Sequence, residues 1–313
     1  MFFHFERIGL DPLVKSAKKY FAERKAQYYN NGERMKSVKE IQLLAHNMRK
    51  QTLKGIHKVG SGHPGGCFSC AEIIAALYSG VMNVDPKNPN WPDRDRFVLS
   101  KGHAGPLLYT ALAYNGFFPM AETENIRGIT SKLQATPKPE VEGCDASAGS
   151  LGQGLSTAVG MALAGKADKK DYKVYALMGD GEQAEGQIWE AVMTAAHYKL
   201  NNLIGIVDQN RVQMCGTVEE ILDTGNIGAK YEAFNWNVIR IDGHDVPQIL
   251  DAFEKAAKVT DKPTVIIAET VKGKGVSFME GKYQWHGCSP TDEQYEIAIS
   301  EIDAAIEKIG GGE

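Results

Sequence analysis

Two short polar sequences, each following an apolar run, carry the residues best suited to bind a metal ion. Asp180 lies between Gly179 and Gly181 at the end of one run, and Asn210 follows the next run along the chain. A carboxylate and an amide oxygen are hard ligands suited to Mg2+ or Ca2+, and the glycines let another group approach the backbone closely. Gly-Asp-Gly alone is better explained as a tight turn. The paired placement favours a metal.

Three histidines form a second group that could do chemistry. His63, His103 and His286 each stand beside glycine or proline in a loop-forming sequence, whereas a core histidine usually lies within a packed element. Imidazole titrates near neutrality and can transfer protons at physiological pH. We therefore treat the three as candidate catalytic or ligand-binding groups. Simple hydrogen bonding within a loop is the alternative for any one of them.

The elements that must position these residues alternate along the chain. Five apolar runs are typical of strands buried on both faces: 97–99, 174–178, 203–207, 238–241 and 265–268. Three helical stretches separate the last four runs: 185–199, 226–235 and 246–259. This alternation predicts an α/β fold, a doubly wound parallel sheet with helices on both faces. Binding sites in such sheets lie at the carboxyl ends of the strands.

Other segments extend this arrangement. Apolar residues from Val38 to Leu53 recur at helical spacing and predict a helix, and the sequence from Thr291 onward predicts another. A further helix is expected after the glycine-rich segment 60–66, opened by a capping box of Ser69 and Glu72. Residues 132–149 form a long loop with two prolines. Loops of that length inside a compact domain are usually functional, so this one is an active-site candidate.

The composition fits one large domain that acts on small molecules. The chain has 313 residues, 43% of them hydrophobic, which is enough for one large core. We expect an N-terminal arm over 1–35 and one domain over 36–313. A net charge of -4 gives no basic field for nucleic acid or an anionic membrane, and no apolar run is long enough to span a bilayer.

The five cysteines show no paired metal-ligand spacing and no secreted disulfide framework. Because the amino terminus also lacks the pattern of a signal peptide, we expect a cytoplasmic protein with reduced thiols. Cys67 and Cys70 do have redox spacing. Two packed thiols near a helix start are the simpler interpretation of that pair.

Five separated motifs resemble transketolase, in the order found in that family. Gly179-Asp180-Gly181 with Asn210 looks like the thiamine-diphosphate motif, which occurs across many thiamine enzymes. The segments that narrow the resemblance to transketolase are 61–65, 93–104, 149–154, 272–275 and 285–287. The resemblance covers about residues 36 to 290. It implies thiamine diphosphate as cofactor, with Mg2+ as the metal and Ca2+ as a possible substitute.

The resemblance also implies roles for individual residues around the metal. Asp180 and Asn210 would bind the metal through their side chains, and Val212 would bind it through its carbonyl group. Gly181 would contact the diphosphate, and Lys272 would lie near it. These assignments are carried over from the family pattern, motif by motif.

Further roles concern the histidines and the other end of the cofactor. By resemblance, His103 and His286 would hydrogen-bond the diphosphate, while His63 and His286 would face the substrate as catalytic residues. The residues expected to line the aminopyrimidine ring are Gly149, Ser150 and Leu151. The implied reaction moves a two-carbon ketol unit from a ketose donor to an aldose acceptor. The implied substrates are sugars or sugar phosphates.

In the family, a glutamate that activates the aminopyrimidine ring belongs to a second, pyrimidine-binding domain. No strand pattern follows Thr291, so we expect that domain on a separate partner, a C-terminal transketolase-like subunit. Thr136 stands where the family has a histidine that recognises the donor's terminal hydroxyl. A related thiamine-dependent transferase, such as a deoxyxylulose-type synthase or an acyl-transferring sugar-modifying enzyme, therefore stays open. A further interpretation of Thr136 is that the loop sequence has changed without functional effect. The alternative to an enzyme is a non-catalytic partner subunit.

Overall fold

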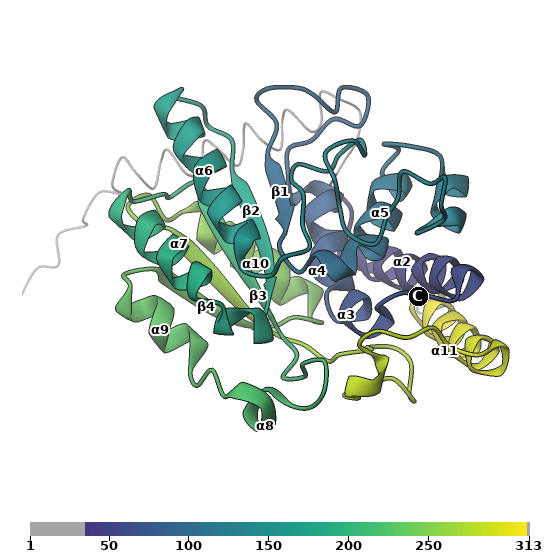
Figure 1. Cartoon of the computed structure of the whole chain (residues 1–313). Helices are drawn as coiled ribbons and strands as arrows, with labels where there is room; N and C mark the ends of the chain where they lie inside the picture. Colours follow the sequence, from purple (N-terminus) through teal and green to yellow (C-terminus); the bar gives the residue numbers. More distant parts are fainter. Residues whose placement is uncertain (1–34, 312–313) are drawn as a thin grey trace, which may run out of the picture.

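Five parallel strands form one sheet at the centre of the computed structural model, which describes residues 35–311 (Figure 1). The strands are β1 (Arg96–Leu99), β2 (Val174–Gly179), β3 (Leu203–Gln209), β4 (Asn237–Asp242) and β5 (Thr264–Glu269). Their order across the sheet is β1-β2-β3-β5-β4. In the register of β2 and β3, Gly179 pairs with Asp208. The loops that carry Asp180 and Asn210 therefore leave the sheet side by side.

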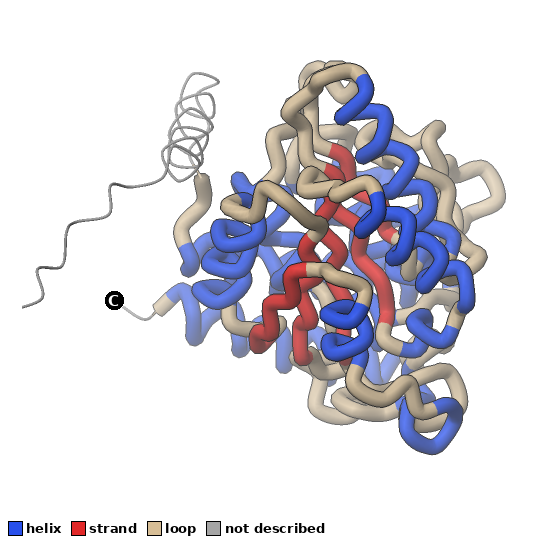
Figure 2. Tube along the Cα trace, turned by 90° about the vertical axis from the view of Figure 1, so that its left-hand side faces the viewer, coloured by secondary structure: helices blue, strands red, loops and turns tan. Residues whose placement is uncertain are grey.

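Helices cover both faces of the sheet (Figure 2). Along β2, Val174, Ala176 and Met178 join one buried cluster, whereas Tyr175 and Leu177 join the other, as the alternation of side chains in a strand requires. The helices of the first cluster are α6 (Gln153–Ala167), α7 (Gly186–His197) and α9 (Ile227–Ala233). Those of the second include α2 (Val38–Val59), α4 (Ala71–Ala76) and α10 (Val246–Ala257). The predicted doubly wound fold is confirmed.

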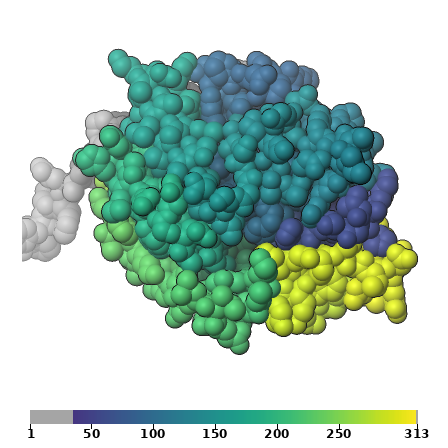
Figure 3. Space-filling view, viewed as in Figure 1, coloured from purple at the N-terminus to yellow at the C-terminus, as the bar shows by residue number. Residues whose placement is uncertain are grey.

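The two longest helices lie side by side and begin in the same way. Ser37 opens α2 and Thr291 opens α11 (Asp292–Gly310), each with a reciprocal capping box. The side chains of Lys50 and Asp303 form an ion pair at 2.6 Å between the two helices. Figure 3 shows α11 along the edge of the molecule, next to α2. Both helices agree with the sequence-based prediction.

The helix expected after residues 60–66 is broken, and its proposed capping box is wrong. The segment forms α3 (Pro64–Phe68), α4 and a π-helical turn, Leu77–Val81. The hydroxyl of Ser69 donates hydrogen bonds to Asp208 and to the carbonyl of Gly66, while Glu72 forms a buried ion pair with Arg49. Both side chains therefore bind partners from distant segments instead of capping a helix. Buried polar atoms need hydrogen-bond partners, and these tertiary contacts provide them.

Three further points differ from the sequence-based picture or extend it. β4 is an edge strand whose side chains are half-buried or exposed, so it is not buried on both faces as predicted. Helices α5 (Gly105–Tyr114) and α6 were not predicted. Nearly all of α5 is buried, so its sequence lacks a polar face to reveal helical periodicity. A small 3-10 turn, Met120–Asn125, follows α5, and α8 (Val218–Leu222) follows β3.

Other expectations concern loops, termini and thiols. Residues 132–149 contain no helix or strand, as predicted. The proposed N-terminal arm lies almost entirely outside the described residues. Within residues 35–311, none of the helices is both long enough and apolar enough to cross a membrane. All five cysteines are free, and burial raises the pKa of Cys67 and of Cys70 to about 12. Such pKa values argue against a reactive redox pair.

Candidate functional site

The two candidate metal-binding loops meet at the carboxyl edge of the sheet. The carboxylate of Asp180, directly after β2, accepts hydrogen bonds from the backbone N–H groups of Gly181, at 2.7 Å, and of Arg211 in the loop after β3. In that second loop, the side-chain oxygen of Asn210 accepts a hydrogen bond from the N–H of Val212 at 3.1 Å. Asp180 thus holds the two loops together, and the oxygens expected to bind a metal lie in one region.

The charge around Asp180 is unusual for a turn residue. The side chain is buried, and burial together with the nearby carboxylate of Asp208 raises the pKa of Asp180 to about 6. Between residues 35 and 311, no lysine, arginine or histidine forms an ion pair with it. Buried carboxylates are normally compensated by a cation. A divalent cation held by Asp180 would supply that compensation.

The three candidate histidines come together from distant segments. His63 precedes α3, His103 lies in a 3-10 turn (Gly102–Ala104) after β1, and His286 follows another (Tyr283–Trp285). The His63 ring lies 5.5 Å from each of the other two rings, which are 5.1 Å apart, measured between ring centroids. Sequence reasoning placed all three in loops, and the fold brings those loops into one cluster.

Burial keeps these imidazoles neutral. It is the largest cause of the lowered pKa of each ring, which falls to about 3 for His286 and well below the ordinary value for His103. Nearby positive charges add to the effect: Lys272 acts on His286, and Arg127 and Lys272 act on His63. Neutral rings can both donate and accept a hydrogen bond, which suits them to substrate hydroxyl groups and to proton transfer.

Lys272 connects the histidine cluster to the expected metal site. Its ammonium group lies 2.8 Å from Nδ1 of His286 and donates hydrogen bonds to the carbonyls of Val212, at 3.0 Å, and Gln213, at 3.3 Å. Burial, followed by repulsion from Lys101, lowers the pKa of Lys272 to about 8. In the part of the chain that the structure describes, Lys272 forms no ion pair with a carboxylate, and a buried cation of this kind favours an anion beside it. The carbonyl of Val212, the third expected metal ligand, is thus in direct contact with the Lys272 ammonium group.

Close backbone packing explains several glycines in this region. A side-chain carbon at Gly66 would lie 2.8 Å from Nε2 of His103, and one at Gly181 would lie 2.9 Å from Cγ of Gln213. Gly149 adopts φ +149°, a conformation that only glycine tolerates readily. Thr136 lies beside it, its hydroxyl oxygen 3.7 Å from where a Cβ of Gly149 would be. Thr136 is therefore adjacent to the segment expected to line the aminopyrimidine ring.

Sequence reasoning missed a buried glutamate that joins two of these segments. The Glu182 carboxylate accepts hydrogen bonds from the N–H of Gly152 at 2.8 Å, the N–H of Gly179 at 2.9 Å and the hydroxyl of Ser100. Burial raises the pKa of Glu182. It ties the loop after β2 to the 149–152 turn. Its place directly after Gly-Asp-Gly was the available signal, but an acidic residue in a loop is ordinary without knowledge of its burial.

The residues present fit a diphosphate bound through a divalent cation. Among residues 35–311, neither the buried carboxylate of Asp180 nor the buried ammonium group of Lys272 forms an ion pair, although the two charges are near enough to attract each other. The described part of the chain holds no cluster of three or more His, Cys, Asp or Glu side chains suited to a metal. The expected ligand set, one carboxylate, one amide and one carbonyl, is of another kind and leaves coordination positions for phosphate oxygens.

Comparisons with known proteins show the family of this chain. The family described as "Transketolase, thiamine diphosphate binding domain" matches residues 40–303. The chain is 43% identical over 272 residues to an apulose-4-phosphate transketolase subunit of Phocaeicola vulgatus, covering 87% of this chain and 97% of that protein. It is 45% identical over 266 residues to the "6-deoxy-6-sulfo-D-fructose transketolase subunit SqwG" of a Clostridium species, covering 84% of this chain and 96% of that protein.

A solved structure gives the same result. Transketolase from Campylobacter jejuni superimposes with a TM-score of 0.81 at 33% sequence identity, covering 88% of this chain and 46% of that chain. The fold, the polar loops at the carboxyl edge of the sheet and the matched sequence therefore agree. This chain belongs to the transketolase family of thiamine diphosphate-dependent transferases and carries the thiamine diphosphate-binding domain of that family.

Proposed function

We propose that this chain is the N-terminal subunit of a split transketolase, which moves a two-carbon ketol unit from a ketose donor to an aldose acceptor. The observation that carries the proposal is the meeting of Asp180, Lys272 and the histidine cluster at one edge of the sheet. There, a buried negative charge and a buried positive charge lie near three neutral imidazoles. That combination suits a metal, a diphosphate and a polar substrate.

The cofactor would be held by groups at both loops. Asp180, Asn210 and the carbonyl of Val212 would bind Mg2+, for which Ca2+ could substitute, while Gly181, His103 and Lys272 would contact the diphosphate. The aminopyrimidine ring would lie against three residues of one turn: Gly149, Ser150 and Leu151. When bound, thiamine diphosphate supplies a carbon nucleophile that can also accept the electron pair of the cleaved carbon–carbon bond.

The histidines would act on the substrate side. Lys272 donates to Nδ1 of His286, so the neutral ring carries its proton on Nε2. That proton is available to a substrate oxygen. His63 contacts His286 edge to face and is also neutral, so it can accept a proton from a hydroxyl group. One ring that donates and one that accepts would support proton transfer during bond cleavage and formation.

The two relatives described above support a split enzyme, because each is named as a subunit and matches this chain over nearly its whole length. We propose that the partner is a C-terminal transketolase-like subunit that carries the pyrimidine-binding domain, in a heterotetramer with two copies of each. Exposed apolar side chains near the site, Met214, Ile221 and Leu222, suit a protein interface. The five free thiols support a cytoplasmic location.

Thr136 bears on the choice of substrate, which would be a sugar or sugar phosphate. The names of the two relatives specify different sugars, one a phosphate and the other a sulfonate. Substrate choice thus differs among related subunits. A related thiamine-dependent transferase, such as a deoxyxylulose-type synthase or an acyl-transferring sugar-modifying enzyme, is a second candidate because Thr136 stands beside Gly149 where the family pattern has a histidine.

Calorimetry on an aspartate variant tests the metal site. Asp180→Ala should weaken Mg2+-dependent binding of thiamine diphosphate at least tenfold and leave the fold intact, because the variant loses a charged ligand. Asp223→Ala is a matched control: Asp223 also accepts a hydrogen bond from a turn glycine, Gly225, at 2.7 Å, but it lies outside the site. Equal affinities for Asp180→Ala and the wild type would contradict the metal assignment.

A mixing experiment tests the split organisation. The purified chain alone should show no ketol transfer, because the activating glutamate is expected on the partner. Addition of the partner subunit should produce both turnover and a stable complex on size-exclusion chromatography. Turnover by the single chain, or two species that do not associate, would show that the proposed organisation is wrong.

A further inference from the structure

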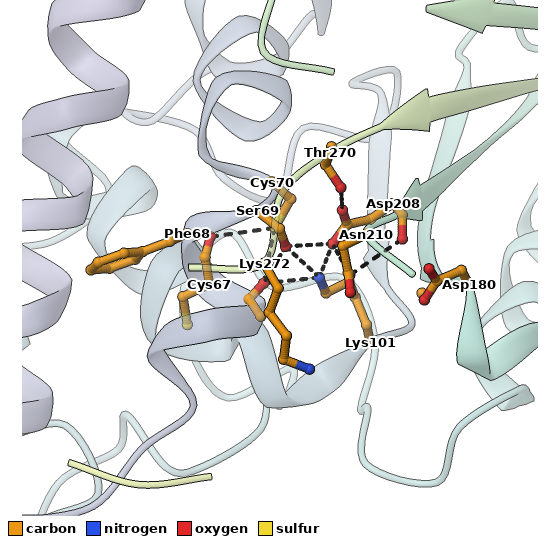
Figure 4. Close-up of polar contacts among 12 residues, drawn as sticks. Cys67, Phe68, Ser69, Cys70, Lys101, Asp180, Asp208, Asn210, Thr270 and Lys272 are labelled. Carbon is orange, nitrogen blue, oxygen red and sulfur yellow. Dashed lines mark hydrogen bonds and ion pairs between the residues drawn. The ribbon is translucent and has the colours of Figure 1, made fainter. Parts of the chain in front are cut away.

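A buried ion pair lies directly behind the candidate metal site. The ammonium group of Lys101 contacts a carboxylate oxygen of Asp208, and their side chains are 1% and 0% exposed. Lys101 follows β1, and Asp208 belongs to the end of β3. Figure 4 shows the pair at the centre of a polar network, with Asp180 on one side and Cys67 and Cys70 on the other.

The pair connects four segments that carry, or lie next to, candidate site residues. Lys101 donates to the carbonyl of Gly66, at 2.8 Å, in the helix that His63 precedes. Asp208 accepts hydrogen bonds from the hydroxyl of Ser69, at 2.6 Å, and from the hydroxyl of Thr270 in the loop after β5. Two carboxylate oxygens and one ammonium group thus join the segments after β1, β3 and β5 to α3.

Two of these contacts fix site residues directly. The amide nitrogen of Asn210 lies 3.4 Å from the Asp208 carboxylate, and the amide oxygen, on the other side of the group, accepts a hydrogen bond from the N–H of Val212 at 3.1 Å. Thr270, held through its hydroxyl, stands two residues before Lys272. The direction of the amide and the path of the loop that carries the ammonium group therefore both depend on one carboxylate.

Stability alone does not account for such a pair. Two charges removed from water lose their hydration, and their mutual attraction often does no more than balance that loss. Apolar side chains of similar volume would commonly give an equally stable core. What the charged pair provides, and apolar packing does not, is direction, because each hydrogen bond holds a particular segment at a particular distance.

We propose that Lys101 and Asp208 are a positioning pair that orients Asn210 toward the metal and Lys272 toward the diphosphate. This inference rests on the proposed function of the site. It assigns to the pair a role in cofactor affinity that is separate from folding. Neither residue needs to contact the cofactor for that role.

The test removes both charges while keeping the volume, in the full-length variant Lys101→Met/Asp208→Asn. Calorimetry with thiamine diphosphate and Mg2+ should show a dissociation constant raised at least tenfold, together with a cooperative thermal transition. Asn202→Ala is the matched control. Asn202 is a buried amide that precedes β3, at the opposite end from Asp208, and it donates a hydrogen bond to the carbonyl of Ala162. The control should lower Tm and change the dissociation constant less than twofold.

Thr270 provides an independent test if the double variant does not fold. Thr270→Val removes one hydrogen bond to Asp208 and keeps the shape, and Thr270→Ser restores the hydroxyl. The valine variant should bind the cofactor several-fold more weakly, and the serine variant should recover wild-type affinity. Wild-type affinity in Thr270→Val, or in a folded double variant, would overturn the positioning role. Failure of the wild-type chain, assembled with its partner subunit, to bind Mg2+ and thiamine diphosphate would instead overturn the proposed function.

Discussion

The ammonium nitrogen of Lys272 lies 2.8 Å from Nδ1 of His286. Burial, followed by repulsion from Lys101, lowers the pKa of Lys272 to about 8. Burial, followed by the positive charge of Lys272, lowers the pKa of His286 to about 3. At neutral pH the lysine is the donor and the imidazole is the acceptor. The contact therefore fixes the tautomer of His286, with its proton on Nε2, and aligns the ring before any substrate is present.

Lys272→Met should change both the histidine and the cofactor affinity. Removal of the positive charge should raise the pKa of His286, although it should stay below 6.5 because burial is the larger cause. Loss of a charged hydrogen-bond donor to the diphosphate should weaken binding roughly 10- to 100-fold. NMR titration of the imidazole protons and calorimetry would measure the two effects.

Lys274→Met is the control for that experiment. Lys274 lies two residues away, is partly exposed and forms an ion pair with Glu280 at 3.5 Å. Its removal should leave both the His286 titration and the cofactor affinity unchanged. An unaltered His286 pKa in Lys272→Met would show that the contact does not control the ring.

Asp180 should make the metal-free chain less stable above pH 6 than it would be with a neutral side chain. Its pKa in the folded chain is about 6, above the unfolded value of roughly 4, so the folded state holds a proton that the unfolded state releases between those pH values. The unfolding free energy therefore falls as pH rises through this window. Asp180→Asn removes the titration and should raise Tm at pH 7.5 but not at pH 4.

The expected gain is on the order of 1–2 kcal/mol at pH 7.5. The pKa shift alone corresponds to roughly 3 kcal/mol. An asparagine has one carbonyl oxygen for the two N–H groups of Gly181 and Arg211, so part of that gain is lost. Thermal unfolding of both proteins without metal, across pH 4 to 7.5, would measure the difference. A variant less stable than the wild type at every pH would contradict the expectation.

The cysteines should separate into protected and reactive groups. Cys67, Cys70 and Cys144 are buried, and burial raises the pKa of each to about 12, whereas Cys215 is exposed. Brief alkylation at pH 7.5 should modify Cys215 readily and leave the three buried thiols intact until the chain is unfolded. Mass spectrometry of the peptides would identify the modified sites. Rapid formation of a Cys67–Cys70 disulfide in the native chain would support a redox role for that pair.

The positions of the strands along the chain and the end of the sheet that carries the site could be predicted from the sequence because both follow from local patterns. Apolar runs marked β2 and β3, and polar residues followed each run directly. The rule that parallel strands end at one edge then placed Asp180 near Asn210, and the pairing of Gly179 with Asp208 agrees with it. Their roles as metal ligands remain predictions.

What the sequence could not predict depends on contacts between distant segments. Ser69 and Glu72 fit a local capping pattern, yet Asp208 and Arg49 hold them in the folded chain. The run in β4 looked like a buried strand because its position at the sheet edge is decided by the pairing of other strands. The Lys101–Asp208 pair joins residues 107 positions apart, a separation that no local periodicity encodes.

The choice of donor should depend on Thr136. Thr136 lies beside Gly149 and packs against the start of α5. A side-chain carbon at Gly105, the first residue of α5, would be 3.5 Å from the Cα of Thr136. Threonine can hydrogen-bond a hydroxyl group, but its reach is shorter than that of a histidine. Thr136→His in the assembled enzyme should therefore raise kcat/KM for hydroxymethyl-ketone donors, such as xylulose 5-phosphate, relative to the native donor.

The ratio of kcat/KM values should change several-fold, since one added hydrogen bond stabilises the transition state by about 1 kcal/mol. Cofactor affinity should stay constant, because Thr136 is expected to face substrate and the candidate diphosphate contacts come from other loops. Thr130→His, at an exposed position in the segment that precedes Thr136, is the control and should leave donor ratios unchanged. Equal ratios of kcat/KM for Thr136→His and the wild type across a donor panel would show that the change to threonine has no functional effect. That result would favour the ordinary transketolase reaction over the related transferases.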